Sequence, residues 1–131
     1  MFTRAIITWF ALLLLAIANG AFRQGVLVPR FDAPLPHQIS TVMLCLAIFA
    51  LTWITIAWIA PANSTDALLI GALWLTLTLA FEFGFGRARG MTWNQLLADY
   101  DIMAGRIWPA VLVVTLLSPL LVGRMRGVIA R

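Results

Sequence analysis

The chain has 131 residues, of which 63% are hydrophobic and only 11% are charged, and its mean hydropathy is +0.98. An ordinary soluble domain carries about 25% charged residues, so this composition excludes the usual water-soluble enzymes and binding domains. Arginine supplies every basic residue, and the excess of arginine over acidic residues gives a net charge of +4. Because the arginines are scattered and form no basic stripe, we expect no nucleic-acid partner.

Four apolar segments, each about long enough to cross a bilayer, predict membrane-spanning helices. A hydrocarbon core of about 30 Å needs roughly 20 apolar residues in a helix. Lipid cannot satisfy open backbone groups, and the alternating pattern of a membrane barrel is absent. We therefore predict an all-α fold, an integral membrane four-helix bundle that forms a single domain over residues 1–131. The predicted spans cover residues 4–22, 38–60, 67–86 and 106–123.

Proline and capping residues mark the boundaries of these segments. Pro36 and Pro61 flank the second span, where proline is expected to interrupt a helix. Residues 63–66 read Asn-Ser-Thr-Asp, a run of residues that favour a helix N-terminus, and they predict the start of the third helix. Pro109 and Pro119 lie in the fourth span and predict a kink or a restarted helix there.

Four spans place both chain termini on one side of the membrane, here called side A. Side B then holds residues 23–37 and 87–105. If Arg23 and Arg106 belong to a buried site, the remaining loop arginines favour side A as the cytoplasmic side. We therefore predict cytoplasmic termini in a bacterial inner membrane, and the near balance of arginines also allows insertion in both orientations.

Further features are expected at the two membrane–water interfaces. Trp9 and Trp58 fall near the side A ends of their spans, where tryptophans form aromatic belts. Near side B, Thr92 and Gln95 have the spacing of a capping box, and residues 93–105 follow. We predict a short amphipathic or re-entrant helix before the fourth span, which either lies in the interface or continues into that span.

Glu82 lies within the apolar run of the third span, near its side B end. A charge in such a segment is costly and usually faces a protein interior or a watery cavity. Trp74, Thr78 and Glu82 recur at every fourth residue and predict one polar–aromatic stripe. Glu82 is expected to be protonated, hydrated or paired, with Arg106 as the first candidate partner because its neighbours are apolar. Two roles stay open, a structural ion pair between helices and an acid that binds a proton or a substrate.

Several other polar residues fall toward side B. Asn19 and Arg23 share a helix face, which suits either a ligand site or a snorkelling arginine beside an interhelical hydrogen bond. Asp99 and Arg106 also share a face, and a solvated surface helix is the alternative there. We expect at least three of Asn19, Arg23, Glu82 and Arg106 to line one pocket. The predicted ligand- or ion-binding residues are Asn19, Arg23, Glu82, Arg87, Asp99, Tyr100 and Arg106.

Signatures of standard enzyme chemistry are absent from the sequence. The chain has one histidine, His37, and one cysteine, Cys45. Together they form no zinc, haem or copper constellation in a monomer. No glycine-rich phosphate loop precedes a helix, and no serine has partners that suggest a catalytic triad. We therefore expect neither a metal nor a cofactor.

These patterns favour a small transporter or channel whose polar site lies near one membrane face. Because four short helices enclose little space, we expect a homo-oligomer, with membrane lipids or another membrane protein as partners. The first alternative is a non-catalytic accessory protein that binds a lipid or another small molecule. The second is a membrane enzyme with Asp99 or Glu82 as general base, although the pattern leans away from an enzyme. A transporter predicts a path that continues toward side A, whereas an accessory protein predicts a site closed below Glu82.

Overall fold

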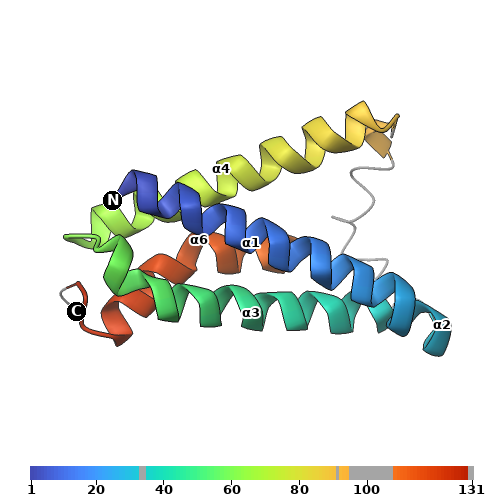
Figure 1. Ribbon diagram of the computed structural model, residues 1–131, viewed down its shortest axis with the longest axis horizontal. Helices are drawn as coiled ribbons and strands as arrows, with labels where there is room; N and C mark the ends of the chain where they lie inside the picture. Colours follow the sequence, from blue (N-terminus) through green and yellow to red (C-terminus); the bar gives the residue numbers. More distant parts are fainter. Residues whose placement is uncertain (33–34, 91, 95–107, 130–131) are drawn as a thin grey trace.

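The computed structural model describes residues 1–32, 35–90, 92–94 and 108–129. Within these ranges the regular structure is helical and no strand occurs, so the prediction of an all-α fold is confirmed. The elements, shown in Figure 1, are α1 (Phe2–Phe22), the π-helix η1 (Arg23–Leu27), α2 (Val28–Arg30), α3 (Leu35–Ile59), α4 (Ser64–Ala88) and α6 (Trp108–Met125).

Three helices are long and apolar enough to cross a bilayer. They cover 29 residues at Phe2–Arg30, 22 at Gln38–Ile59 and 25 at Ser64–Ala88. At a rise of about 1.5 Å per residue, each exceeds the thickness of a hydrocarbon core of about 30 Å. The fourth apolar helix, Pro109–Met125, is shorter. It runs continuously through Pro119, so the helix does not restart there.

The first helical rod continues past Phe22, where the sequence prediction ended it, as far as Arg30. The connecting element is the π-helix, in which the Val28 N–H donates to the Arg23 carbonyl five residues earlier. Pro29 follows directly, and a proline lacks an N–H and crowds the carbonyl four residues before it. The wider π turn moves that carbonyl away, so the rod passes the proline without ending.

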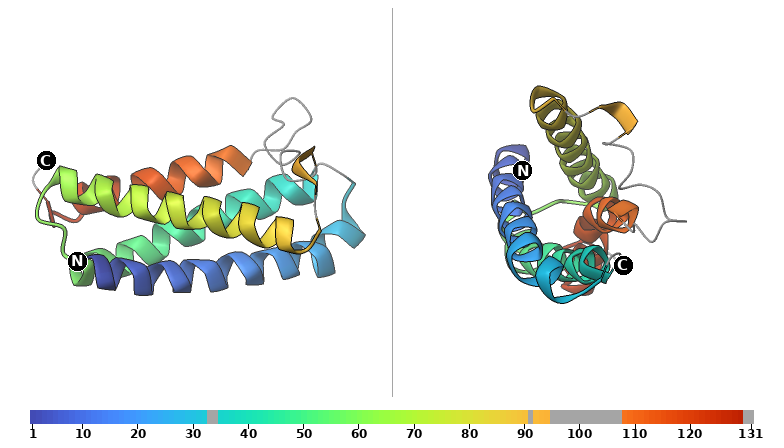
Figure 2. Two further views of the ribbon diagram at one scale, coloured as in Figure 1. Left: turned by 90° about the horizontal axis from the view of Figure 1, so that it is seen from above. Right: turned by 90° about the vertical axis from the view of Figure 1, so that its right-hand side faces the viewer.

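The helices alternate in direction, and both termini lie at the same end of the molecule (Figure 1). Helix α3 packs against α1 and α6, and α4 packs mainly against α6. Helices α1 and α4 are close near their N-terminal ends and then diverge, as Figures 1 and 2 show. The end away from the termini, which corresponds to side B, is therefore the looser part of the bundle.

Helices α4 and α6 approach each other closely at Gly71 of α4. A Cβ atom on this residue would lie 1.9 Å from the carbonyl oxygen of Leu116 in α6. Small residues allow such backbone contact between helices, and dispersion contacts are the main attraction between helices in an apolar environment. Gly71 therefore fixes the position of α4 on α6.

The core lies between the helices and extends from the end that holds the termini past the middle of the bundle. Trp74 is fully buried, and its indole N–H donates to the carbonyl oxygen of Ala5 over 2.9 Å. Trp9 is also buried, and its indole N–H donates to the Thr78 hydroxyl over 3.1 Å. The expectation that Trp9 belongs to an interface belt is thus wrong, because Thr78 supplies the acceptor that a buried indole needs. Trp58, by contrast, is 45% exposed.

Two arginines join the chain ends to the last turns of α3. The Arg4 guanidinium lies 5.3 Å from the centroid of the Trp58 ring and donates to the Trp58 carbonyl over 2.6 Å. Arg126 makes the same pair of contacts with Trp53, at 5.8 Å and 2.6 Å. Cations near a helix C-terminus are favoured by the helix dipole, and each ring adds a cation–π attraction. Both chain ends are thereby held on α3.

The start of α4 offers a local test of helix capping. The Asn63 side chain accepts from the Asp66 N–H over 2.9 Å, as the Asn-Ser-Thr-Asp run predicts. We expect Asn63→Ala to lower the free energy of unfolding by about 1 kcal/mol, because one N–H loses its acceptor. Thermal unfolding in a neutral detergent measures this loss, with Thr65→Ala as the control on an exposed neighbour. Equal melting temperatures for the two variants would contradict the capping role.

Candidate functional site

A cavity of about 210 Å³ lies between helices α1, α3, α4 and α6, toward side B of the bundle. Each of the four helices contributes side chains to it, and most of these are apolar. Among the described residues of the lining, Glu82 is the one that carries a charge. The lining residues are Trp9, Leu12, Leu13, Ala16, Ile17, Leu44, Ile48, Thr78, Phe81, Glu82, Val111 and Thr115.

Glu82 is brought to the cavity by the predicted stripe on α4. Trp74 is fully buried in the core, Thr78 holds the Trp9 indole, and Glu82 is half-buried in the cavity wall. The three residues share a face because they lie four residues apart on a helix. Helix α4 diverges from α1 in this direction (Figure 1), and the stripe passes from the buried core at Trp74 to the cavity wall at Thr78 and Glu82.

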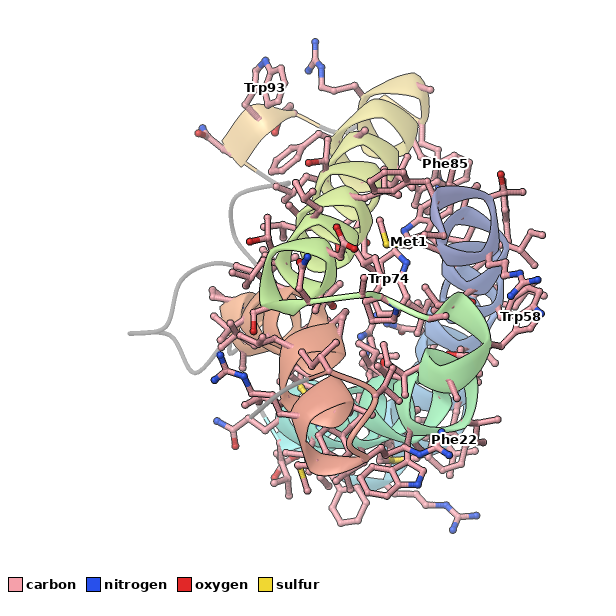
Figure 3. The ribbon with its side chains drawn as sticks, turned by 90° about the vertical axis from the view of Figure 1, so that its left-hand side faces the viewer. Met1, Phe22, Trp58, Trp74, Phe85 and Trp93 are labelled. Carbon is pink, nitrogen blue, oxygen red and sulfur yellow. The ribbon has the colours of Figure 1, made fainter. Side chains whose placement is uncertain are left out.

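A layer of fully buried side chains lies between the cavity and side A. Helices α1, α3, α4 and α6 each contribute to it, on the side A side of the residues that line the cavity. In Figure 3 the Trp74 side chain lies in the middle of the bundle, whereas Trp58 and Trp93 lie at its edge. The layer consists of Ala5, Thr52, Ile56, Ile70, Trp74 and Val122.

Two aromatic rings, those of Trp9 and Phe81, line the same cavity as Glu82. The rings of Trp9 and Phe81 meet edge to face, with centroids 6.4 Å apart. Phe81 in turn stacks on Phe85 at 5.2 Å, which restricts its rotation. Aromatic faces attract cations, and a nearby carboxylate adds a full negative charge. The wall therefore combines apolar surface with two features that favour a positive charge.

A second polar cluster joins α1 to α3. The Asn19 side-chain amide donates to the Ser40 carbonyl over 3.0 Å, and the Ser40 hydroxyl donates to the Asn19 side-chain oxygen. An Arg23 terminal nitrogen, Nη1, lies 3.5 Å from the same hydroxyl oxygen. Ser40 is fully buried, so the cluster lies inside the bundle. Ser40 was not among the predicted site residues, and a single serine near the start of an apolar helix gave no signal of this role.

The structure separates residues that the sequence suggested would converge. Asn19 and Arg23 share a face of the first rod, as predicted, but they meet Ser40, and neither lines the Glu82 cavity. That cavity therefore does not contain the expected three members of the set. Arg87 is exposed at the end of α4, where its guanidinium lies 5.1 Å from the Trp93 ring centroid.

The remaining predicted site residues, Asp99, Tyr100 and Arg106, lie outside the described residues. The expected pair between Glu82 and Arg106 therefore stays a prediction. The short helix predicted over residues 93–105 also stays a prediction, except at Trp93 and Asn94, which are helical. Among the described residues, no three His, Cys, Asp or Glu side chains are grouped as metal ligands.

Comparison with known proteins finds no matching family model, no similar curated protein and no similar solved structure.

Proposed function

We propose that this chain binds a compact organic cation at Glu82. In this proposal the chain is a four-helix protein of a bacterial inner membrane, and both of its termini are cytoplasmic. The single observation that carries the proposal is the position of Glu82 as the one charged residue in the described lining of a mostly apolar cavity that also holds Trp9 and Phe81. A carboxylate and aromatic faces both attract positive charge, and the apolar wall suits an apolar body. A cation with an apolar body would match both features.

The size of the cavity limits the ligand. Its volume of about 210 Å³ exceeds the roughly 150 Å³ of a dry cavity that binds benzene. It is smaller than the range of about 300–1,000 Å³ that holds drug-sized molecules. One aromatic ring bearing a quaternary ammonium group matches this size and the Trp9–Phe81–Glu82 wall. A proton would compete with such a ligand for the same carboxylate.

Transport is the second candidate function, and the divergence of α4 from α1 favours it. The buried layer around Trp74 favours ligand binding over an open channel within one chain. A transporter would therefore need a second conformation in which this layer opens, or a route between the subunits of a homo-oligomer. Binding at Glu82 would be the first step in either case.

The test uses two probes that have the same shape and differ in charge, phenyltrimethylammonium and tert-butylbenzene. Titration calorimetry of the full chain in neutral detergent should show binding of the cation by the wild type. We expect Glu82→Gln to weaken cation binding by about tenfold or more, because the compensating carboxylate is lost. Binding of tert-butylbenzene should change little. Acidification should weaken cation binding to the wild type, because a proton competes for Glu82, and should have no effect in Glu82→Gln.

Asp32→Asn is the matched control, because Asp32 is exposed beyond the end of the first rod and lies outside the cavity. Equal cation binding by the wild type, Glu82→Gln and Asp32→Asn would refute the proposal. Thermal unfolding of the same samples tests the structural alternative. If Glu82 belongs to a buried ion pair, Glu82→Gln should cost about 3–5 kcal/mol of stability, and the ligand-binding role would then be rejected.

A further inference from the structure

The Arg23 guanidinium is directed into the bundle and does not snorkel toward side B. Its Nη1 lies 3.5 Å from the Ser40 hydroxyl oxygen, at the level where Asn19 meets α3. Its Nη2 lies 3.8 Å from the place where a Cβ of Gly20 would be, which is an ordinary van der Waals distance. Helical side chains lean toward the helix N-terminus, and this brings the guanidinium beside Gly20.

The position of Arg23 along the rod makes this orientation costly. The rod continues for seven residues beyond Arg23, to Arg30. At about 1.5 Å per residue, Arg23 lies roughly 10 Å below the end of the rod. Its guanidinium points still deeper, toward the fully buried Ser40. An arginine at this depth would ordinarily extend its charge toward water, so a partner must favour the inward position.

The described partners leave the charge of Arg23 uncompensated. Asn19 and Ser40 satisfy each other through two hydrogen bonds, and Arg23 contributes only the longer Nη1 contact to this cluster. The Nε atom is buried and has no hydrogen-bond partner. Within the described residues, no carboxylate forms an ion pair with Arg23. A buried donor without an acceptor and a charge without a counter-ion are both unfavourable, and an anion would relieve both.

We propose that Arg23 binds a phosphate group and that Asn19 and Ser40 position it for this role. A guanidinium presents several N–H donors in one plane, which suits the oxygens of a phosphate. A phosphate group would reach the donors of Arg23 from side B, either as a phospholipid headgroup or as soluble phosphate. The described charges at this end are mainly positive, with Arg23, Arg30, Arg87 and Arg89 against Asp32 and Glu82.

The π-helix that begins at Arg23 turns Leu27 back toward the face that carries Asn19 and Arg23. In a regular α-helix, residues four apart advance by about 40° around the axis, so Leu27 would drift from the line of Asn19 and Arg23. The wider π turn reverses part of this drift. Leu27 is buried, and the π-helix contacts α3. The contact of the first rod with α3 thus continues past Arg23.

The test measures phosphate recognition by the full chain in neutral detergent, using native mass spectrometry. The probes are dioleoylphosphatidylglycerol, dioleoylglycerol, which lacks the phosphate, and inorganic phosphate. The wild type should prefer phosphatidylglycerol over the diacylglycerol by about tenfold or more. Arg23→Gln should lose this preference. Arg30→Gln, which removes the same charge from an exposed position of the same rod, should keep it within about twofold.

Three further measurements separate the possible outcomes. Displacement of phosphatidylglycerol by millimolar inorganic phosphate would identify a soluble phosphate as the ligand. The absence of displacement would identify the lipid headgroup as the ligand. Either result supports a phosphate site. If Arg23→Gln does not fold, Arg23→Lys should fold and keep the preference at a reduced level, because it retains the charge but loses the planar donors. The Glu82→Gln variant should retain the preference, which makes the result independent of the cation site.

Two results would overturn the proposal. The first is an equal phosphate preference in Arg23→Gln and Arg30→Gln, which would show that only the general positive charge of this end matters. The second is a strong coupling between Arg23 and an acid of the chain. A double-mutant cycle that pairs Arg23→Gln with Asp99→Asn or Asp101→Asn measures it by thermal unfolding. Strong coupling would mean that the guanidinium is compensated inside the protein.

Discussion

Gly71→Ala should lower the free energy of unfolding by about 3 kcal/mol, the upper end of the usual cost of overpacking. The added Cβ would lie 1.9 Å from the Leu116 carbonyl oxygen and 2.8 Å from the carbonyl carbon. Both are backbone atoms, so no side-chain rotation can relieve the clash, and α4 must move away from α6. Far-UV circular dichroism during thermal unfolding in neutral detergent measures the loss.

Gly84→Ala is the matched control for this prediction. Gly84 lies on the same helix, is exposed, and has no atom within 4 Å of the place where a Cβ would be. Alanine favours a helix over glycine by about 0.5–1 kcal/mol, so this variant should be as stable as the wild type or slightly more stable. Equal melting temperatures for Gly71→Ala and Gly84→Ala would show that α4 and α6 do not meet at Gly71.

Trp74→Ala should cost about 3–5 kcal/mol, the usual loss when a buried tryptophan is removed from a core. The side chain is fully buried and donates a hydrogen bond to Ala5 across the α1–α4 contact. The variant would also remove the largest member of the buried layer between the Glu82 cavity and side A. We therefore expect both a lower melting temperature and a larger cavity, detectable as stronger uptake of a neutral apolar probe such as tert-butylbenzene.

Trp58→Ala provides the comparison, because Trp58 is 45% exposed and packs mainly against Arg4. Removing this ring should cost about 1 kcal/mol, the scale of an exposed cation–π contact. The two tryptophans thus differ by several-fold in their expected effect although their sequence surroundings are similarly apolar. Similar losses from both variants would place Trp74 outside the core and would leave the cavity open toward side A.

The two candidate sites depend on different contacts between the helices. The cavity at Glu82 depends on the divergence of α4 from α1, whereas the Arg23 cluster depends on the contact of the first rod with α3 through Ser40. A change that draws α4 toward α1 would reduce the cavity and leave the Arg23 cluster in place. The cation and the phosphate group are therefore expected to bind independently.

Local sequence determined the helices of this protein. Apolar runs of sufficient length predicted the long helices, and Asn63 capped α4 where the capping residues indicated. These features depend on residues close together in the chain, so neighbouring side chains and backbone hydrogen bonds decide them. The stripe of Trp74, Thr78 and Glu82 was predictable for the same reason, since a helix places every fourth residue on nearly the same face.

Only the tertiary structure decided which apolar surfaces face the core and where the polar side chains point. Trp9 and Trp58 both lie in apolar stretches of the sequence, yet Trp9 is buried and Trp58 is exposed. Lipid and a protein core are similar solvents, so hydrophobicity cannot distinguish a core face from a lipid face. The inward position of Arg23 likewise depends on Ser40, which is distant in sequence, and the space beside Glu82 depends on the angle between α1 and α4.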